Sequence, residues 1–180
     1  LLEFHIPKPT SPADLKQGDD PRQLGIGFIK LQLATAEASA APSSPAPAGA
    51  TYAAGIAAST DRLELKQGDT AALTFTLINH STLTWRSDPP NPINFSYHLL
   101  DRDGKMLKYD NPRTVFPQPI APGQTATLTL KLGADLFPGP GQYRLDFDLV
   151  HEGQTWFAEK GSPTLTIPVT VTARKSGGSR

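Results

Sequence analysis

The sequence predicts an all-β fold, an immunoglobulin-like antiparallel β-sandwich of about seven to nine strands. Two observations carry this prediction. Apolar and polar residues alternate with a period of two in several runs after residue 60, which is typical of strands with one buried and one solvated face. Turn sequences rich in glycine and proline separate these runs, such as "APGQ" at 121–124 and "FPGPGQ" at 137–142, and no run has a helical period.

The alternation is clearest in four runs, at 70–79, 125–132, 142–150 and 164–171. In the first, Leu73, Phe75 and Leu77 share one face and threonines occupy the other. Shorter strands are expected at 63–65, 93–100, 105–109 and 155–158. Pro168 lies inside the last of the four runs and cannot donate a hydrogen bond, so we expect that strand to lie at a sheet edge or to carry a bulge.

The chain divides into four segments by composition. Residues 34–50, "ATAEASAAPSSPAPAGA", are interrupted by prolines and form an expected Ala/Pro/Ser linker. The sandwich is assigned to 51–173, and a polar tail to 174–180. Residues 1–33 end in one strand-like run, and a lone strand needs sheet partners. The segment therefore reads as the C-terminal remnant of an upstream β-rich module, and the chain as a fragment of a larger protein.

Composition argues against several functional classes. Lys and Arg together number 17, as do Asp and Glu, so there is no basic excess of the kind that nucleic-acid binding favours. The sequence contains no cysteine, and its four histidines lack the spacing of a zinc site. We therefore expect no metal, no cofactor and no nucleic-acid partner. No apolar run approaches the roughly 20 residues of a membrane-spanning helix, so no membrane span is expected in this fragment.

Two acidic groups invite a catalytic interpretation. Asp146 and Asp148 lie on one face of a predicted strand beside Arg144, and paired carboxylates can hydrolyse a glycosidic bond when they flank a sugar in a cleft. Nothing in the sequence predicts such a cleft, so a solvated strand face is favoured over a small hydrolase. The "DRDG" stretch at 101–104 lacks the remaining positions of a calcium loop and is expected to form a hairpin turn.

The aromatic residues leave two alternatives open. Trp85, Trp156 and Tyr97 could present flat faces to sugar rings, or they could fill the core of the sandwich. Trp156 and Phe157 are consecutive on a predicted strand and must point in opposite directions, so one can anchor the core while the other meets solvent or a partner. Burial of all three aromatic residues would remove the sugar-binding platform.

Between residues 73 and 171, four stretches resemble a known family. They are "LINHSTLTW", "SYHLLDRDGK", "RTVFPQPIAPGQTATLTL" and "PGPGQYRLDFDLVHEGQTWFAEKG". Together they resemble the immunoglobulin-like accessory domain of bacterial surface-polysaccharide enzymes, which is attached to glycosyltransferases and methyltransferases. The fold type is also similar to the sandwich that ends O-antigen transporter ATPases. Residues 1–33 are similar to the closing segment of a β-rich module of glycosyltransferase-type proteins.

The resemblance implies a non-catalytic accessory domain of a bacterial polysaccharide biosynthesis or export protein. Its partners would be a glycan or the catalytic domain of the same polypeptide, and a biosynthetic parent enzyme would place it in the cytoplasm. The candidate ligand-binding residues are Tyr97, Arg113, Asp148 and Trp156. The alternative is a structural or protein-interaction module that binds no sugar.

Overall fold

The computed structural model describes residues 51–174, which contain nine strands. The predicted N-terminal remnant, the linker and all of the polar tail except Arg174 lie outside the described residues. The strands are β1 (Ala54–Ala58), β2 (Leu63–Lys66), β3 (Thr70–Asn79), β4 (Ile93–Asp101), β5 (Met106–Lys108), β6 (Thr125–Gly133), β7 (Gly141–His151), β8 (Thr155–Trp156) and β9 (Leu165–Thr172). Two short 3-10 turns, η1 (Ala134–Leu136) and η2 (Ala158–Lys160), follow β6 and β8. Neither turn, nor any other part of residues 51–174, offers an apolar helix long enough to cross a membrane.

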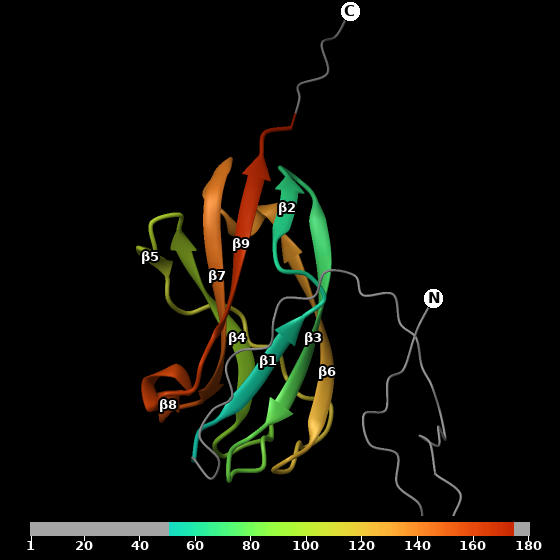
Figure 1. The fold of residues 1–180 in the computed structure, drawn as a ribbon, viewed down its shortest axis with the longest axis vertical. Helices are drawn as coiled ribbons and strands as arrows, with labels where there is room; N and C mark the ends of the chain where they lie inside the picture. Colours follow the sequence, from blue (N-terminus) through green and yellow to red (C-terminus); the bar gives the residue numbers. More distant parts are fainter. Residues whose placement is uncertain (1–50, 175–180) are drawn as a thin grey trace, which may run out of the picture. The chain divides into compact units, whose positions relative to one another are not determined.

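The strands form two sheets that pack face to face (Figure 1). One sheet has the order β1-β3-β6, and the other has the order β2-β9-β7-β4-β5 with β8 paired to β7. The β3–β6 and β4–β7 pairs are antiparallel and run in continuous register over nine residues each. The predicted immunoglobulin-like β-sandwich is therefore confirmed, and eight of the nine strands of residues 51–174 lie close to the predicted ranges.

The core lies between the two sheets and is built from the alternating apolar positions. Phe75 of β3 meets Phe147 of β7 at 4.5 Å and Phe95 of β4 at 5.0 Å between ring centroids. Trp85, in the loop between β3 and β4, is fully buried and packs against Phe116 and Phe157. Burying side chains of this size supplies much of the stability of a sandwich.

Strand β1 was not predicted from the sequence. Its segment "AGIAA" contains alanine and glycine, which have low β propensity, so only Ile56 suggested a strand. Ala54, Ile56 and Ala58 are nevertheless buried in the core. Gly55 faces His80, whose ring would lie only 3.0 Å from a Cβ atom at this position. A Cβ atom at position 55 would therefore require the His80 ring to shift.

The sheet edges also differ from prediction in one respect. β9 lies between β2 and β7, and its register with β7 is continuous through Pro168, so the expectation that Pro168 marks an edge strand or a bulge is wrong. β2 pairs with β9 in parallel, the one parallel pair among the described strands, and this pairing begins at Val169. Pro168 therefore lies one residue before the pairing of β9 with β2 begins. Its missing N–H costs no hydrogen bond between these two strands.

The hairpin between β4 and β5 is the turn predicted at "DRDG". The Asp101 carboxylate accepts hydrogen bonds from the backbone N–H groups of Asp103 and Lys105, both at 2.9 Å. Gly104 has a φ of 87°, a conformation that glycine adopts without steric cost. The carboxylate thus stabilises the turn through backbone hydrogen bonds.

Candidate functional site

The candidate site lies on the outer face of the larger sheet. Ser96 and His98 of β4 and Asp148 and Val150 of β7 point away from the core, yet all four are buried. Two segments cover them: residues 109–114, and the stretch from β8 through η2 at 155–160. Ser96 donates to the carbonyls of Asn111 and Pro112 at 3.2 Å. The prediction that this strand face is solvated is therefore wrong at Asp148, whereas Arg144 and Asp146 are partly exposed.

Four side chains, which we call the Trp156 cluster, meet beneath these segments: His98, Tyr109, Arg113 and Trp156. The His98 ring centroid lies 4.2 Å from that of Trp156 and 4.4 Å from that of Tyr109. The Arg113 guanidinium lies 4.9 Å from the Trp156 ring centroid, within the range of a cation–π interaction. Trp156 is only 7% exposed, whereas Tyr109 is 42% exposed.

Arg113 connects the cluster to the neighbouring loops through charged hydrogen bonds. Its Nε donates to Glu152 Oε1 at 2.7 Å and its Nη2 donates to Asp110 Oδ1 at 2.9 Å. The remaining amino group, Nη1, donates to the carbonyl of Asn111 at 2.8 Å. Glu152 also accepts from Asn94 at 3.2 Å. Burial opposes ionisation of Glu152, but the hydrogen bonds from Arg113 and Asn94 hold its pKa below the usual value.

Tyr109 is held by a second carboxylate. Its hydroxyl donates to Glu159 Oε1 at 3.0 Å, and the Thr155 hydroxyl donates to Glu159 Oε2 at 2.8 Å. These bonds lower the pKa of Glu159, with Thr155 contributing most. Burial and the hydrogen bond to Glu159 raise the pKa of Tyr109 to about 12. The phenol therefore remains a protonated donor at neutral pH.

Asp148 is fully buried behind the cluster. Its Oδ1 accepts from the backbone N–H of Leu149 at 2.7 Å and its Oδ2 accepts from the N–H of Ala158 at 3.1 Å. Desolvation raises its pKa to about 7, and the two backbone hydrogen bonds only partly oppose this shift. Asp148 therefore fastens η2 to the sheet, because Ala158 is the first residue of that turn.

The two carboxylates considered for hydrolysis have separate surroundings. Asp146 accepts from the Thr166 hydroxyl at 2.6 Å and lies 3.9 Å from Arg144 Nη2. Asp148 is enclosed by protein, so a sugar bond could not lie between the two carboxylates as glycoside hydrolysis requires. The geometry gives no support to the hydrolase alternative.

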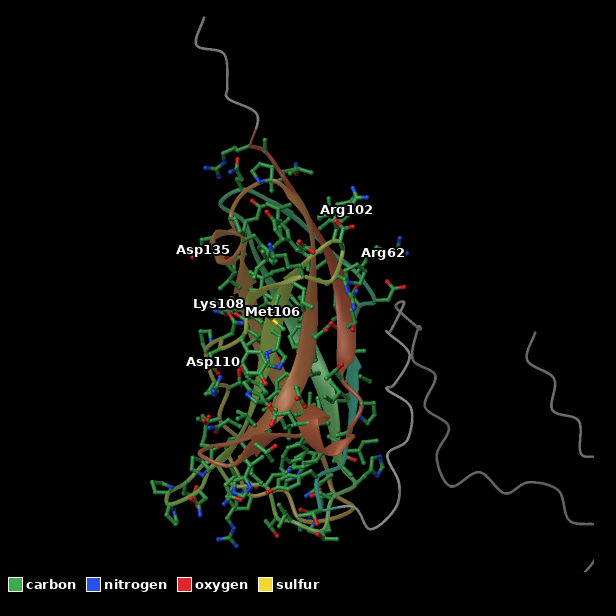
Figure 2. The ribbon with its side chains drawn as sticks, turned by 90° about the vertical axis from the view of Figure 1, so that its left-hand side faces the viewer. Arg62, Arg102, Met106, Lys108, Asp110 and Asp135 are labelled. Atoms are coloured by element: carbon green, nitrogen blue, oxygen red, sulfur yellow. The ribbon has the colours of Figure 1, made fainter. Side chains whose placement is uncertain are left out.

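An open depression of about 330 Å³ lies beside the cluster. Its floor and walls combine an aromatic ring with charged and amide groups: Tyr109, Asp110, Arg113, Glu152, Gln154 and Glu159. Figure 2 shows Met106, Lys108 and Asp110 following one another along this side of the domain. Aromatic and hydrogen-bonding side chains that converge in a depression are the usual components of a ligand site.

The structure brings three of the four predicted site residues together. Arg113 and Trp156 contact each other on the outer face, and Asp148 lies fully buried on the same face. Tyr97 points into the core between the sheets, and burial raises its pKa. The prediction of an exposed aromatic platform at Tyr97 and Trp156 is therefore wrong. Trp156 and Phe157 do point in opposite directions: Phe157 belongs to the core, whereas Trp156 lies in the outer cluster.

Sequence reasoning missed the residues that are most accessible at the site. Tyr109, Glu152 and Glu159 come from a loop, a turn and a 3-10 turn, and only the structure shows that they line one depression. Their local signal was weak, since each occurs near glycine, proline or other charged residues. No group of three His, Asp or Glu side chains within residues 51–174 is arranged to hold a metal ion.

No family model and no curated protein matches this chain. Among solved structures it is similar to a β-glucosidase from Listeria innocua in complex with glucose, with 16% identity and a TM-score of 0.43 over 66% of this chain and 16% of that one. A family 123 glycoside hydrolase from Clostridium perfringens matches at 12% identity and a TM-score of 0.35, over 64% of this chain and 23% of that one. An ASH/PapD-like domain of human CEP192 matches at 11% identity and a TM-score of 0.33, over 87% of this chain and 99% of that one. This chain thus spans 16% of the length of the β-glucosidase, and at these TM-scores the likenesses assign no function to it.

Proposed function

We propose that this domain is a non-catalytic accessory module of a bacterial surface-polysaccharide biosynthesis or export protein, and that it binds or positions glycan at the depression beside Tyr109. The proposal rests on one observation. A half-exposed tyrosine ring lies among the charged and amide side chains of an open depression. Such rings stack on the C–H faces of sugars, while nearby polar groups hydrogen-bond sugar hydroxyls.

The surroundings of Tyr109 support this role. Its ring stacks on His98 and meets the Trp156 ring edge-on at 5.5 Å, so it is held in place before any ligand arrives. A fixed ring loses little conformational entropy on binding. Arg113 and Glu159 are likewise held by hydrogen bonds, at 2.7 Å to Glu152 and at 3.0 Å to Tyr109 respectively. The binding surface is therefore preorganised.

A titration with fragments of bacterial surface polysaccharides tests the proposal. In NMR spectra of the labelled chain we expect the amide signals of residues 109–113 and 152–156 to shift. Tyr109→Ala should weaken binding about tenfold or more, because aromatic contacts of this kind contribute on the order of 1 kcal/mol or more. Tyr109→Phe keeps the ring and should keep most of the affinity. Leu107→Ala, another half-exposed residue, is the control.

A structural or protein-interaction module remains the second candidate. Trp85, Trp156 and Tyr97 are all buried, so these large aromatic residues serve packing, and Tyr109 is the exposed aromatic ring of the cluster. If the fragments produce no shift in the depression, or if Tyr109→Ala binds them as well as the unaltered chain, the glycan proposal fails and this second candidate takes its place.

A further inference from the structure

The smaller sheet has an edge whose backbone groups are unpaired. β6 pairs with β3. Hydrogen bonds at the two ends of this ladder show which residues of β6 face β3: Asn79 N–H donates to the Gln124 carbonyl, and Ala134 N–H donates to the Asp69 carbonyl, both at 2.9 Å. Alternate residues of an antiparallel strand direct their N–H and C=O groups to opposite sides. The odd-numbered positions, Thr125, Thr127, Thr129 and Lys131, therefore direct these groups away from β3. Figure 1 shows β6 at the outer side of its sheet.

No residue of the described range 51–174 forms a backbone hydrogen bond with these outward groups of Thr127, Thr129 or Lys131. Proteins usually protect a sheet edge by keeping it short or by adding a bulge, a proline or charges. In the larger sheet the edges follow this rule: β5 has three residues and lies beside a register shift, and β2 has four. β6 has nine residues, continuous register, no proline and one charge, Lys131.

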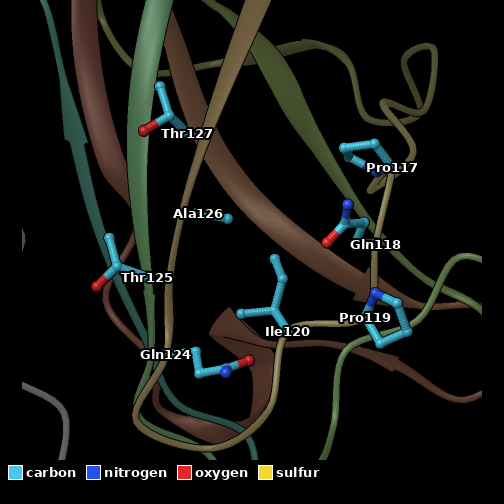
Figure 3. Close-up of a pocket in the computed structure, with 8 residues that line it drawn as sticks. All are labelled: Pro117, Gln118, Pro119, Ile120, Gln124, Thr125, Ala126 and Thr127. Carbon is cyan, nitrogen blue, oxygen red and sulfur yellow. The ribbon is translucent and has the colours of Figure 1, made fainter.

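A pocket of about 420 Å³ adjoins the first half of this edge. Gln124 to Thr127 line one side, and the segment from Pro117 to Ile120 lines the other (Figure 3). Thr125 and Thr127 point to one side of the strand, whereas the small Ala126 side chain points toward Ile120 and Gln118. The lining carries no charged side chain. Pro117, Pro119, Ile120 and Ala126 supply its apolar part and two glutamines and two threonines its polar part, so it suits an uncharged side chain.

We propose that β6 is a docking edge for an extended peptide of a separate protein, which adds to the sheet as a further strand and inserts an uncharged side chain into this pocket. The outward N–H and C=O groups recur about every 7 Å, the two-residue repeat of a strand. An extended polypeptide presents complementary groups at the same repeat, and strand addition is a known mode of peptide recognition. Lys131, at the end of the strand far from the pocket, favours an acidic residue in the peptide. This surface lies on the other sheet from the glycan site and is independent of it.

The test uses the isotope-labelled 180-residue chain and a synthetic ten-residue peptide of alternating valine and threonine, with a glutamate placed to reach Lys131. On addition of the peptide, the amides of Thr127, Thr129 and Lys131 should shift and exchange more slowly with solvent. Thr127→Pro removes an outward N–H and leaves the β3 ladder intact, so it should weaken binding at least about tenfold while the fold persists. The same peptide with alternate N-methyl groups should not bind.

The control variant is Glu64→Pro at the edge of the other sheet. Gln67 N–H donates to the Thr172 carbonyl of β9, so the odd-numbered residues of β2 face β9 and the N–H of Glu64 points away from the sheet. Glu64→Pro should therefore bind the peptide as well as the unaltered chain. If Thr127→Pro does not fold, Ala126→Phe fills the pocket and should weaken binding instead.

Three results would overturn the proposal. The first is an absence of shifts at β6 up to the solubility limit of the peptide, or binding that survives both N-methylation and the β6 variants. The second is a dimer of the chain alone that Thr127→Pro abolishes, which would make a second copy the occupant. The third is protection of the β6 amides in the monomer before peptide is added, which would mean that the chain itself covers the edge.

Discussion

Asp148 is a carboxylate whose charged form is disfavoured by its place in the fold. It is fully buried on the outer face of β7, and desolvation, with a smaller repulsive contribution from Glu159, outweighs two backbone hydrogen bonds. Its pKa rises from 3.8 to about 7. The folded protein therefore binds a proton at pH values where the unfolded chain has released it.

This pKa predicts that the free energy of unfolding falls as the pH rises from about 4 to about 7. Below pH 4 Asp148 is protonated in both states and its contribution is constant. Above pH 7 it is ionised in both states, and the folded state has lost stability on the order of 4 kcal/mol. Urea denaturation at a series of pH values measures the slope, and Asp148→Asn should remove most of it.

The control for this prediction is Asp146→Asn on the same strand. Asp146→Asn removes a carboxylate that bonds Thr166 and leaves the surroundings of Asp148 in place, so the pH dependence caused by Asp148 should persist in this variant. Asparagine at position 148 also brings an NH₂ group against a backbone N–H, which lowers stability equally at all pH values. An unchanged slope in Asp148→Asn would show that another group causes the pH dependence.

Asn79 stabilises the loop that carries Trp85. Its Nδ2 donates to the carbonyls of Leu83 and Ile120, both at 2.8 Å, and its Oδ1 accepts from the hydroxyl and N–H of Ser81. Asn79→Asp should lower the free energy of unfolding by more than about 3 kcal/mol, because a buried carboxylate would face two carbonyl oxygens. Urea denaturation measures the loss. Thr82→Asp, at an exposed position of the same loop, should have little effect, and equal losses in the two variants would contradict this role.

At the residue scale, the sequence predicts which face of the sheet a side chain points to, but it does not predict whether another segment buries that face. The alternation in β7 correctly directs Leu145, Phe147 and Leu149 into the core. It also directs Asp148 to the opposite face, but it carries no information on what lies over that face. The segments that bury Asp148 and Trp156 are irregular and have no periodic signal. The aromatic platform expected at Trp156 is absent for this reason, and Tyr109 takes the accessible position.

At the scale of elements, the segment 109–114 is held on the sheet by a small number of specific contacts. Asn111 Nδ2 donates to the Tyr97 carbonyl at 3.0 Å, and Arg113 reaches Glu152, Asp110 and the Trp156 ring. Because Arg113 presents several donors in a fixed fork, it can join loops that no hydrogen-bond ladder connects. Backbone hydrogen bonds between Phe95 and Thr114 hold the end of this segment. Arg113 adds the contacts that link the segment to Glu152 and Trp156.

We expect Arg113→Ala to loosen this cover. It should lower the free energy of unfolding by about 1–3 kcal/mol, since it removes charged hydrogen bonds and leaves Glu152 less well paired. It should also expose Trp156, which acrylamide quenching and a red shift of tryptophan fluorescence would detect. Arg113→Lys keeps the positive charge but loses the planar guanidinium group, so its effects on the free energy of unfolding and on Trp156 exposure should be intermediate.

Arg102→Ala is the matched control. Arg102 pairs with Asp103 at 3.3 Å on an exposed turn, and such pairs contribute roughly 0–1 kcal/mol. If Arg113→Ala and Arg102→Ala have the same small effect, and tryptophan quenching does not change, then the segment 109–114 is held by other contacts.

At the scale of the molecule, the class of fold was predictable and the strand order was not. Alternation and turn residues are local, and they locate β3, β6, β7 and β9 closely. Sheet order depends on contacts between distant segments, such as Leu63 of β2 with Val169 of β9. Pro168 suggested an edge strand because the sequence does not show that β2 pairs with β9, nor that this pairing begins at Val169. The site depends on the same long-range contacts, since residues 109–113 meet residues 152–159 only in the folded sandwich.

The distribution of the core leads to a prediction about the excised domain. Among the described residues 51–174, the buried hydrophobic cluster extends from Ala54 to Val171, and both sheets are formed by strands of this range. We therefore expect residues 51–174, produced alone, to unfold in a single cooperative transition. The urea midpoint should equal that of the 180-residue chain, and so should the dependence of the unfolding free energy on urea, which scales with the surface exposed on unfolding. A lower midpoint would show that residues outside 51–174 stabilise the sandwich, and a non-cooperative transition would show that this core cannot hold the fold alone.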